Sequence, residues 1–402
     1  MCIRKLFKPK IKMTITESVN PCTFLIQGTV KCCCRRAKSG NVQFTTDFVS
    51  GSGTVSIVPN PAPIAKGAFQ ATLTADSGTV GRVAVVATAT ACRGNASTQN
   101  TININCDPSD PASIYVANSN DNIVSVIDGA TNTVMNNILA GPAPVGVTVN
   151  AATNRVYVTS KEHNNVSVIN AVTNQVIATI ATISPLFPSV NTATNRIYVG
   201  HSHANTVSVI DGATNTITYH ITLAKSPYGI ATNPLTNTIY VAEPGCNSVE
   251  AINGATNTVT DSIPVGCSPA MVAVNPTTNL IYVTNQTNET VSVIDGAANT
   301  VIATIPICSS PLGIAVNPAT NFIYTTNPEA CTVSVINGNN NTITRTIKVG
   351  DRPSFVAVNP DTNLIYVSNS SSNTVSVING ATNMIVATVR VGCFPYGLDV
   401  LP

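Results

Sequence analysis

Short apolar runs separated by polar, turn-forming residues recur along most of the chain, and the most regular of them contains an aliphatic residue followed by tyrosine. Runs of this length, rich in β-branched residues, predict strands. The aliphatic–tyrosine pair occurs seven times, at Ile114-Tyr115, Val156-Tyr157, Ile197-Tyr198, Ile239-Tyr240, Ile281-Tyr282, Ile323-Tyr324 and Ile365-Tyr366. Successive tyrosines are 41 or 42 residues apart. A period in the low forties predicts a radial array in which each unit is one small sheet.

The unit from 311 to 352 shows the parts of one repeat. Its apolar runs predict four strands, at residues 311–316, 322–326, 332–336 and 342–349. A proline-containing turn separates the first two strands, and Asn337-Gly338 is a hairpin signal between the last two. We therefore predict an all-β fold in which residues 108–402 form a seven-bladed β-propeller, with one four-stranded antiparallel sheet per blade.

The two ends of the array are incomplete in complementary ways. The first unit begins at its tyrosine strand, whereas the chain finishes with a first strand, residues 395–400, that nothing follows. The chain contains seven first strands and seven tyrosine strands, so every blade has one of each if the last strand completes the first blade. This predicts a ring closed by the C-terminal strand, an arrangement that removes an exposed sheet edge.

The sequence of the repeat resembles that of a known family. Ile281-Tyr-Val-Thr-Asn285, followed by Val291-Ser-Val-Ile-Asp-Gly296 and Val301-Ile-Ala-Thr-Ile305, is similar to the YVTN family of β-propeller repeats, and the resemblance covers residues 108–402. Relatives include surface-layer and other envelope proteins, bacterial periplasmic propellers, and propeller domains of some redox enzymes and lactonases. The resemblance implies architecture rather than activity, because a propeller hosts many functions.

Residues 1–107 lack the repeat, and the acidic, proline-containing run from Cys106 to Pro111 is typical of a domain boundary. Short β-like runs upstream of it predict a β-sandwich over residues 21–107. Their strand spacing and small-residue turns are similar to those of bacterial immunoglobulin-like modules, which in surface proteins serve as spacers or adhesive stalks. Residues 1–20 are expected to form a basic N-terminal tail.

Charge is distributed unevenly between the two parts. Residues 1–106 hold 12 cations and 3 acids, a balance of +9, whereas residues 107–402 hold 8 cations and 15 acids, a balance of −7. A basic segment on an acidic body favours docking to a polyanion or to the acidic face of a like molecule. The alternative is a solvated terminus without a partner.

Twelve cysteines are many for a reducing cytosol. The triplet Cys32-Cys33-Cys34 has no zinc-ligand spacing, and the following arginines favour thiolates, so we expect either covalent cross-linking into an assembly or pairing within the domain. In the propeller, Cys308 precedes a first strand and Cys331 follows the tyrosine strand paired with it. These two cysteines are therefore a candidate disulfide.

The repeat is irregular in blades two to four. Three residues after the tyrosine the usual residue is asparagine, but these blades have Ser160, His201 and Glu243. His163, His203 and Cys246 lie nearby in the loops that follow. Histidine, glutamate and cysteine are ligands that transition metals accept, so this set is a candidate ligand or metal site. The alternative is neutral drift of exposed loop positions.

No catalytic motif is visible: the chain has no Gly-x-Ser-x-Gly elbow, phosphate-binding glycine loop or His-Glu-x-x-His pair. Only 9% of residues are charged, and the absence of tryptophan excludes tryptophan-derived cofactors. We therefore expect a non-enzymatic structural or interaction protein of a cell envelope, surface layer or spore coat that binds other proteins or itself and needs no cofactor. The alternatives are a lactonase-like or metal-binding propeller enzyme, and a soluble binder of a ligand or polyanion.

The location is predicted from the start of the chain and from its hydropathy. Met1 to Met13 has the charged region of a secretory signal without the apolar segment, and no run approaches the ~20 apolar residues of a membrane span. We expect no membrane span, and association with a cell surface or a spore coat assembled inside the cell. A cytoplasmic protein is the alternative.

Overall fold

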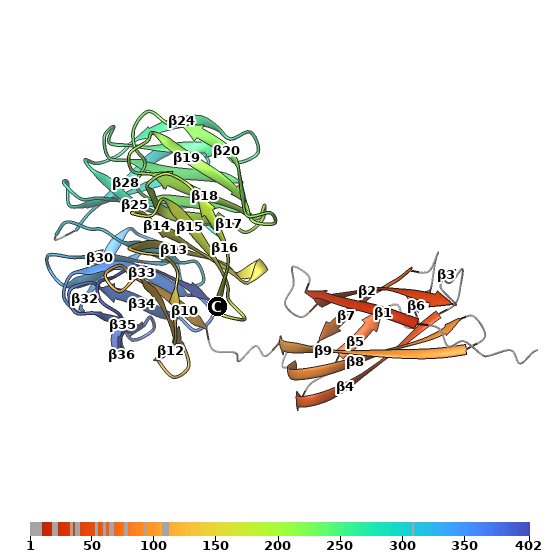
Figure 1. Cartoon of the computed structure of the whole chain (residues 1–402). Helices are drawn as coiled ribbons and strands as arrows, with labels where there is room; N and C mark the ends of the chain where they lie inside the picture. The colour runs from red at the N-terminus through yellow and green to blue at the C-terminus, as the bar shows by residue number, and fades with distance from the viewer. Residues whose placement is uncertain are drawn as a thin grey trace, which may run out of the picture. The chain divides into compact units, whose positions relative to one another are not determined.

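The computed structural model describes residues 112–402, apart from Cys308, with their side chains, and the strands between residues 10 and 106 by their backbone (Figure 1). The chain divides into two compact units, Met1–Asp110 and Pro111–Pro402.

The described strands of the first unit form two antiparallel sheets. One has the order β1–β2–β7–β5, with β3 beside β2, and the other has the order β6–β4–β8–β9. The strands are β1 (Lys10–Glu17), β2 (Thr23–Cys32), β3 (Arg35–Arg36), β4 (Asn41–Ser52), β5 (Val55–Val58), β6 (Ala62–Pro63), β7 (Ala68–Ala75), β8 (Thr79–Ala91) and β9 (Gly94–Cys106). Strand β1 lies in the stretch for which the sequence predicts a tail.

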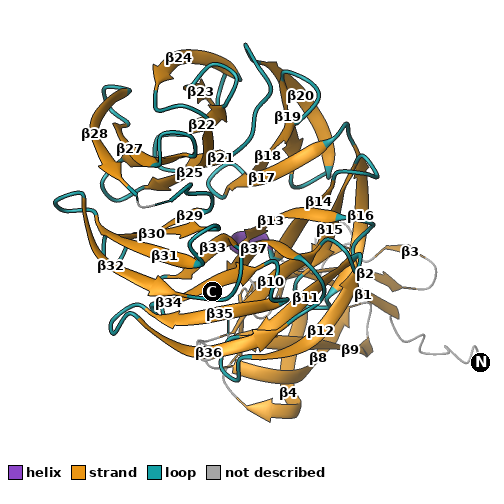
Figure 2. Cartoon of the chain, turned by 90° about the vertical axis from the view of Figure 1, so that its left-hand side faces the viewer, coloured by secondary structure: helices purple, strands orange, loops and turns teal. Residues whose placement is uncertain are grey.

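The second unit is a seven-bladed β-propeller, as the repeat predicts (Figure 2). Each blade is a four-stranded antiparallel sheet, and the first strands of neighbouring blades lie side by side around the axis. These first strands are β13 (Pro144–Asn150), β17 (Pro185–Asn191), β21 (Ile230–Asn233), β25 (Pro269–Asn275), β29 (Ile314–Asn317), β33 (Pro353–Asn359) and β37 (Pro395–Leu401). A single turn of 3-10 helix, η1 (Ala151–Thr153), follows β13.

The remaining strands follow the first strands outward in chain order. The second strands, which carry the tyrosines, are β10 (Ser113–Asn118), β14 (Arg155–Ser160), β18 (Arg196–His201), β22 (Thr238–Glu243), β26 (Leu280–Asn285), β30 (Phe322–Asn327) and β34 (Leu364–Asn369). The third are β11 (Ile123–Asp128), β15 (Asn165–Asn170), β19 (Thr206–Asp211), β23 (Ser248–Asn253), β27 (Thr290–Asp295), β31 (Thr332–Asn337) and β35 (Thr374–Asn379). The outermost are β12 (Thr133–Leu139), β16 (Gln175–Ala181), β20 (Thr216–Thr222), β24 (Thr258–Pro264), β28 (Thr300–Pro306), β32 (Thr342–Lys348) and β36 (Met384–Arg390).

The seven tyrosines pack the blades against one another. Each has no solvent-exposed surface, and each of those from Tyr115 to Tyr240 packs against aliphatic residues on the second strand of the following blade. Tyr240, for example, shares a cluster with Ile281 and Val283. Burial raises the pKa of Tyr240 to about 12, so the phenol stays neutral. The tyrosine that recurs in the sequence is thus the residue that recurs at the interfaces between blades.

Asparagine side chains connect successive blades near the turns that follow the first strands. The amide nitrogen of Asn233 donates to Asn279 Oδ1 over 2.7 Å, and Asn275 donates to Asn321 in the same way over 2.8 Å. Asn279 and Asn321 have positive φ angles of 56°, a conformation that asparagine tolerates better than most residues. These repeated turns therefore use asparagine both for the left-handed backbone conformation and for the hydrogen bond to the neighbouring blade.

The first blade contains both ends of the propeller chain. Strand β37 lies antiparallel to β10, and the sheet has the order β12–β11–β10–β37. On one side Ser368 Oγ, in the last blade, donates to the carbonyl of Tyr396 over 2.6 Å. On the other side Asp399 Oδ2 accepts from the backbone nitrogen of Val149, in the second blade, over 2.8 Å. Strand β37 thus bonds to both neighbouring blades.

Asp399 should make propeller stability depend on pH. Burial raises its pKa from 3.8 to about 6. The folded state therefore holds the proton more tightly than the unfolded chain, so the stability contributed by this group is complete below about pH 4 and is lost as pH rises through about 6. The loss is at most about 3 kcal/mol, at 1.4 kcal/mol per pKa unit. We expect Asp399→Asn, measured by thermal unfolding from pH 4 to pH 7, to gain stability relative to the parent as pH rises.

The matched control for this prediction is Asp361→Asn, which removes an exposed acid from a turn. Its unfolding over the same pH range shows the effect of removing an acid that is not buried, with which the effect of Asp399→Asn is compared. A constant difference between Asp399→Asn and the parent would show that the Asp399 carboxyl has the same pKa in the folded and unfolded chain.

Candidate functional site

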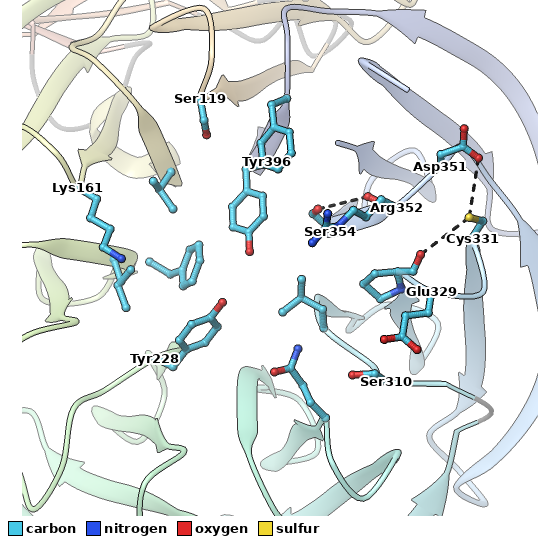
Figure 3. A pocket seen from close by; sticks show the side chains of 17 residues that line it. Ser119, Lys161, Tyr228, Ser310, Glu329, Cys331, Asp351, Arg352, Ser354 and Tyr396 are labelled. Atoms are coloured by element: carbon cyan, nitrogen blue, oxygen red, sulfur yellow. Dashed lines mark hydrogen bonds between the residues drawn. The ribbon is translucent and has the colours of Figure 1, made fainter. Parts of the chain in front are cut away.

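A cavity of about 940 Å³ lies around the propeller axis, on the face formed by the loops between second and third strands (Figure 3). First strands supply its floor, and Lys161, Glu329 and Asp351 are among the loop residues at its rim. We call this cavity the central cup. Its volume is in the range of cavities that hold small ligands or side chains of a partner.

Aromatic rings close the floor of the central cup. The rings of Phe187 and Phe355, from blades three and seven, meet with centroids 4.7 Å apart. Tyr228 packs edge-on to Phe187 at 5.2 Å, and Tyr396 packs against Phe355 at 5.2 Å. Phe187 and Phe355 are almost fully buried. The central cup is therefore closed at its floor, because the two rings meet across the axis.

Glycines let the strands that carry these rings pack closely against their neighbours. Each first strand has a proline at its start or shortly before it. At the second position after this proline the residues, in order around the propeller, are Gly397, Gly146, Phe187, Gly229, Met271, Gly313 and Phe355. A Cβ on Gly313 would lie 2.5 Å from the carbonyl oxygen of Ser354, and one on Gly229 would lie 2.4 Å from that of Ala270. Small residues thus let neighbouring first strands approach closely, while the large ones fill the centre.

The two tyrosines place hydroxyl groups inside the cup. The hydroxyls of Tyr228 and Tyr396 point toward the middle of the cavity from opposite sides (Figure 3). Burial raises the pKa of Tyr228, and the neighbouring Tyr396 raises it further. The two hydroxyls give the floor a donor and acceptor pair beside apolar rings.

The rim of the cup carries both signs of charge. Lys161 comes from blade two, Glu329 from the loop after β30, and Asp351 with Arg352 from the approach to β33. The thiol of Cys331 lies 3.9 Å from both Asp351 Oδ1 and the carbonyl of Pro328. An apolar floor below a rim of mixed charge suits a ligand that has a hydrophobic group and flanking polar or charged groups.

Three of the residues that the sequence singled out in blades two to four, Ser160, His201 and Glu243, lie elsewhere, inside the blades. In four blades the residue three after the tyrosine is an asparagine that donates over 2.9 Å to a third-strand serine, as Asn118 does to Ser125. We call these two side chains and their fourth-strand neighbour the polar row of a blade. Ser160, His201 and Glu243 occupy the asparagine position, so they are buried rather than exposed in loops.

The residues that replace asparagine in these blades form hydrogen bonds that differ from blade to blade. In blade two, Ser160 and Ser167 both donate to the carbonyl of Ala140, over 3.4 and 2.7 Å. In blade three, His201 Nε2 lies 2.7 Å from Ser208 Oγ, which lies 3.0 Å from His220 Nδ1. Burial lowers the pKa of His201, which favours the neutral imidazole. The fourth histidine of the chain, which the sequence did not single out, thus belongs to this row.

Blade four contains two buried carboxyl groups in its polar row. Glu243 has no exposed surface and accepts from the backbone nitrogen of Lys225 over 3.3 Å, while its Oε1 has no hydrogen-bond partner among the described residues. Ser248 and Ser262 donate to Glu250 Oε1 over 3.1 and 2.6 Å. Burial raises the pKa of Glu243, and the charge of Glu250 raises it further. This row therefore takes up a proton more readily than an exposed glutamate.

The other candidates from the sequence are distributed differently. His163, His203 and Cys246 are exposed in loops. Within the part of the chain whose side chains are described, no group of three or more histidine, cysteine or acidic residues is arranged to hold a metal. The candidate disulfide includes Cys308, and the candidate cross-linking cysteines are Cys32, Cys33 and Cys34. Cys308 and these three side chains lie outside the described residues.

Comparisons with solved structures support the seven-bladed β-propeller fold. No family model and no curated protein matches the chain. A functionally unknown protein from Desulfotomaculum acetoxidans is similar in structure, with a TM-score of 0.64 at 17% identity, covering 72% of this chain and 98% of that one. Hydrazine synthase from Kuenenia stuttgartiensis has a TM-score of 0.58 at 18% identity, covering 62% of this chain and 87% of its own.

A third similar structure is the dihydro-heme d1 dehydrogenase NirN, with a TM-score of 0.55 at 16% identity, covering 69% of this chain and 63% of its own. Identities this low establish the fold alone. The similar structures include enzymes and a protein of unknown function, so they do not choose between catalysis and binding. In the described part of this chain, no helix has the length and apolar character needed to cross a membrane.

Proposed function

We propose that this protein is a non-enzymatic binding protein, in which the central cup holds a side chain and flanking residues of a partner protein. The observation that carries the proposal is the aromatic floor at the axis of the ring, below a rim with both signs of charge. Buried aromatic anchors surrounded by a polar rim are the usual composition of a protein-binding hot spot. The proposed setting is a cell envelope, surface layer or spore coat.

Three further features belong to this proposal. The first is membership in the YVTN-type propellers, which rests on the sequence of the repeat. The second is an immunoglobulin-like N-terminal module that would hold the propeller away from a surface. The third is ring closure by β37, which is supported by its pairing with β10 and would make the cup a rigid site. A rigid site binds with a lower cost in conformational entropy.

Binding through the cup predicts a specific effect of Tyr228. A peptide array of overlapping and randomised sequences should yield peptides with an aromatic or large aliphatic residue beside charged residues. Tyr228→Ala should weaken binding of the selected peptides by at least about tenfold, as expected for a hot-spot residue. The matched control is Tyr219→Ala, which removes a tyrosine that is 47% exposed on the outer strand β20 and should leave binding unchanged.

The same samples distinguish the other functions that the sequence leaves open. Lactone hydrolysis by the parent protein with added divalent metal would favour a lactonase-like or metal-binding enzyme. Salt-dependent retention of the full chain on a polyanion column, without peptide binding, would favour a polyanion binder. Peptide binding that is equal in the parent and in Tyr228→Ala would contradict a role for the cup.

A further inference from the structure

A second cavity, of about 560 Å³, lies on the outside of the propeller, where the end of β16 in blade two faces β20 in blade three. We call it the outer cleft. Its apolar wall comes from Ala181, Ile183, Ala204 and Ile217, and its ionisable lining side chains are His201 and His220 alone. The outer cleft is formed by other residues than the central cup, so the two sites can be tested separately.

A hydrogen-bond chain determines where the protons lie on both imidazoles. The carbonyl of Ile183 can only accept, so His201 Nδ1 carries the hydrogen of that contact. In the neutral ring Nε2 then accepts from the hydroxyl of Ser208. That hydroxyl has one hydrogen, so Ser208 Oγ accepts from His220 Nδ1. These hydrogen bonds therefore leave a lone pair free on His220 Nε2, which has no partner in the polar row.

We propose that the outer cleft binds a small weak acid with an apolar body, such as a medium-chain carboxylic acid, with His220 as its polar anchor. His220 Nε2 holds the proton shared between the imidazole and the acid. It can do so without disturbing the row, because His220 Nδ1 donates to Ser208 in both the neutral and the protonated ring.

The lining of the outer cleft also selects against other ligands. It contains no carboxylate and no lysine or arginine. A cationic amphiphile would therefore find no partner for its charge and would face an imidazole that can itself become positive. An uncharged amphiphile would gain the apolar contact but not the charge-assisted hydrogen bond, which is about twice as strong as a neutral one.

The proposal is tested with three probes of equal chain length: octanoate, octanol and octylammonium. Titrations followed by calorimetry and by NMR of the histidine side chains should show octanoate binding tightest, with shifts at His220. His220→Gln should weaken octanoate binding by at least about tenfold, the loss expected for a hydrogen bond to a charged group. NMR should also show His201 and His220 both protonated at Nδ1 in the neutral form.

The matched control is His203→Gln, which removes an exposed histidine that does not line the outer cleft and should leave octanoate affinity unchanged. Tyr228→Ala should also bind octanoate normally, which separates this site from the central cup. Equal affinity for the three probes, no octanoate binding, an unchanged His220→Gln variant or an Nε2–H tautomer at either histidine would each overturn the proposal.

Discussion

Deletion of residues 395–402 is expected to destabilise the whole propeller rather than one blade. The deletion removes β37, and with it the strand that pairs with β10 and bonds to the blades on both sides. It also removes Leu398 and Val400, which are 5% and 6% exposed and belong to the core of the ring. Burial of two such side chains contributes about 3–6 kcal/mol, before the lost hydrogen bonds are counted.

The expected result is a fall in melting temperature on the order of 10–20 °C, at 2–4 °C for each kcal/mol in a domain of this size. Strand β10 would become an exposed edge, so the truncated protein should also self-associate, which size-exclusion chromatography would detect. Deletion of the exposed residue Pro402 alone is the control and should leave the melting temperature unchanged. An unchanged melting temperature for the longer deletion would contradict closure of the ring by β37.

The sequence predicts the blades well because their determinants are local and repeated. Each tyrosine lies in a short run of apolar residues that is buried on both faces, and the tyrosine itself forms part of the interface with the next blade. The glycines after the third strands were interpreted as residues that turn the chain. In the structure Gly338 has no positive φ, whereas Asn341, three residues later, has a φ of 57°. A Cβ on Gly338 would lie 2.6 Å from Asn321 Oδ1, so the glycine allows the turn that contains Asn321 to pack closely against it.

The candidate sites were harder to predict, because they combine residues from different repeats. Comparison of repeats found His201 and Glu243 as exceptions, but could not show that the position is buried and paired with the third strand. His220 was missed because its neighbours in the polar row are 12 and 19 residues away in sequence. A signal for the central cup was present in the alternation of glycine with Phe187, Met271 and Phe355 at one position of the first strand. Its meaning depends on rings that meet across the axis, a contact between blades three and seven that no single repeat contains.

That alternation leads to the second large effect, which we expect for Gly313→Ala. The new Cβ would lie 2.5 Å from the carbonyl oxygen of Ser354 and 2.8 Å from Phe355 Cα. Both are backbone atoms of the neighbouring first strand, so the contact can be relieved only by moving one strand away from the other. Overpacking of this kind costs about 1–3 kcal/mol, which corresponds to a fall in melting temperature of about 2–12 °C. Because Phe355 moves with its strand, the near-ultraviolet circular dichroism of the aromatic floor should change as well.

Gly245→Ala is the matched control, because its new Cβ would lie 3.4 Å or more from the side chain of Lys225 and would meet no backbone atom that close. Its melting temperature should equal that of the parent within the error expected for a surface substitution, about 0.5 kcal/mol. Suppose instead that Gly313→Ala had the same melting temperature as Gly245→Ala and the same aromatic circular dichroism as the parent. The first strands would then be able to move apart without a cost in stability. The floor of the central cup would then be adaptable, and the low entropic cost proposed for binding there would be lost.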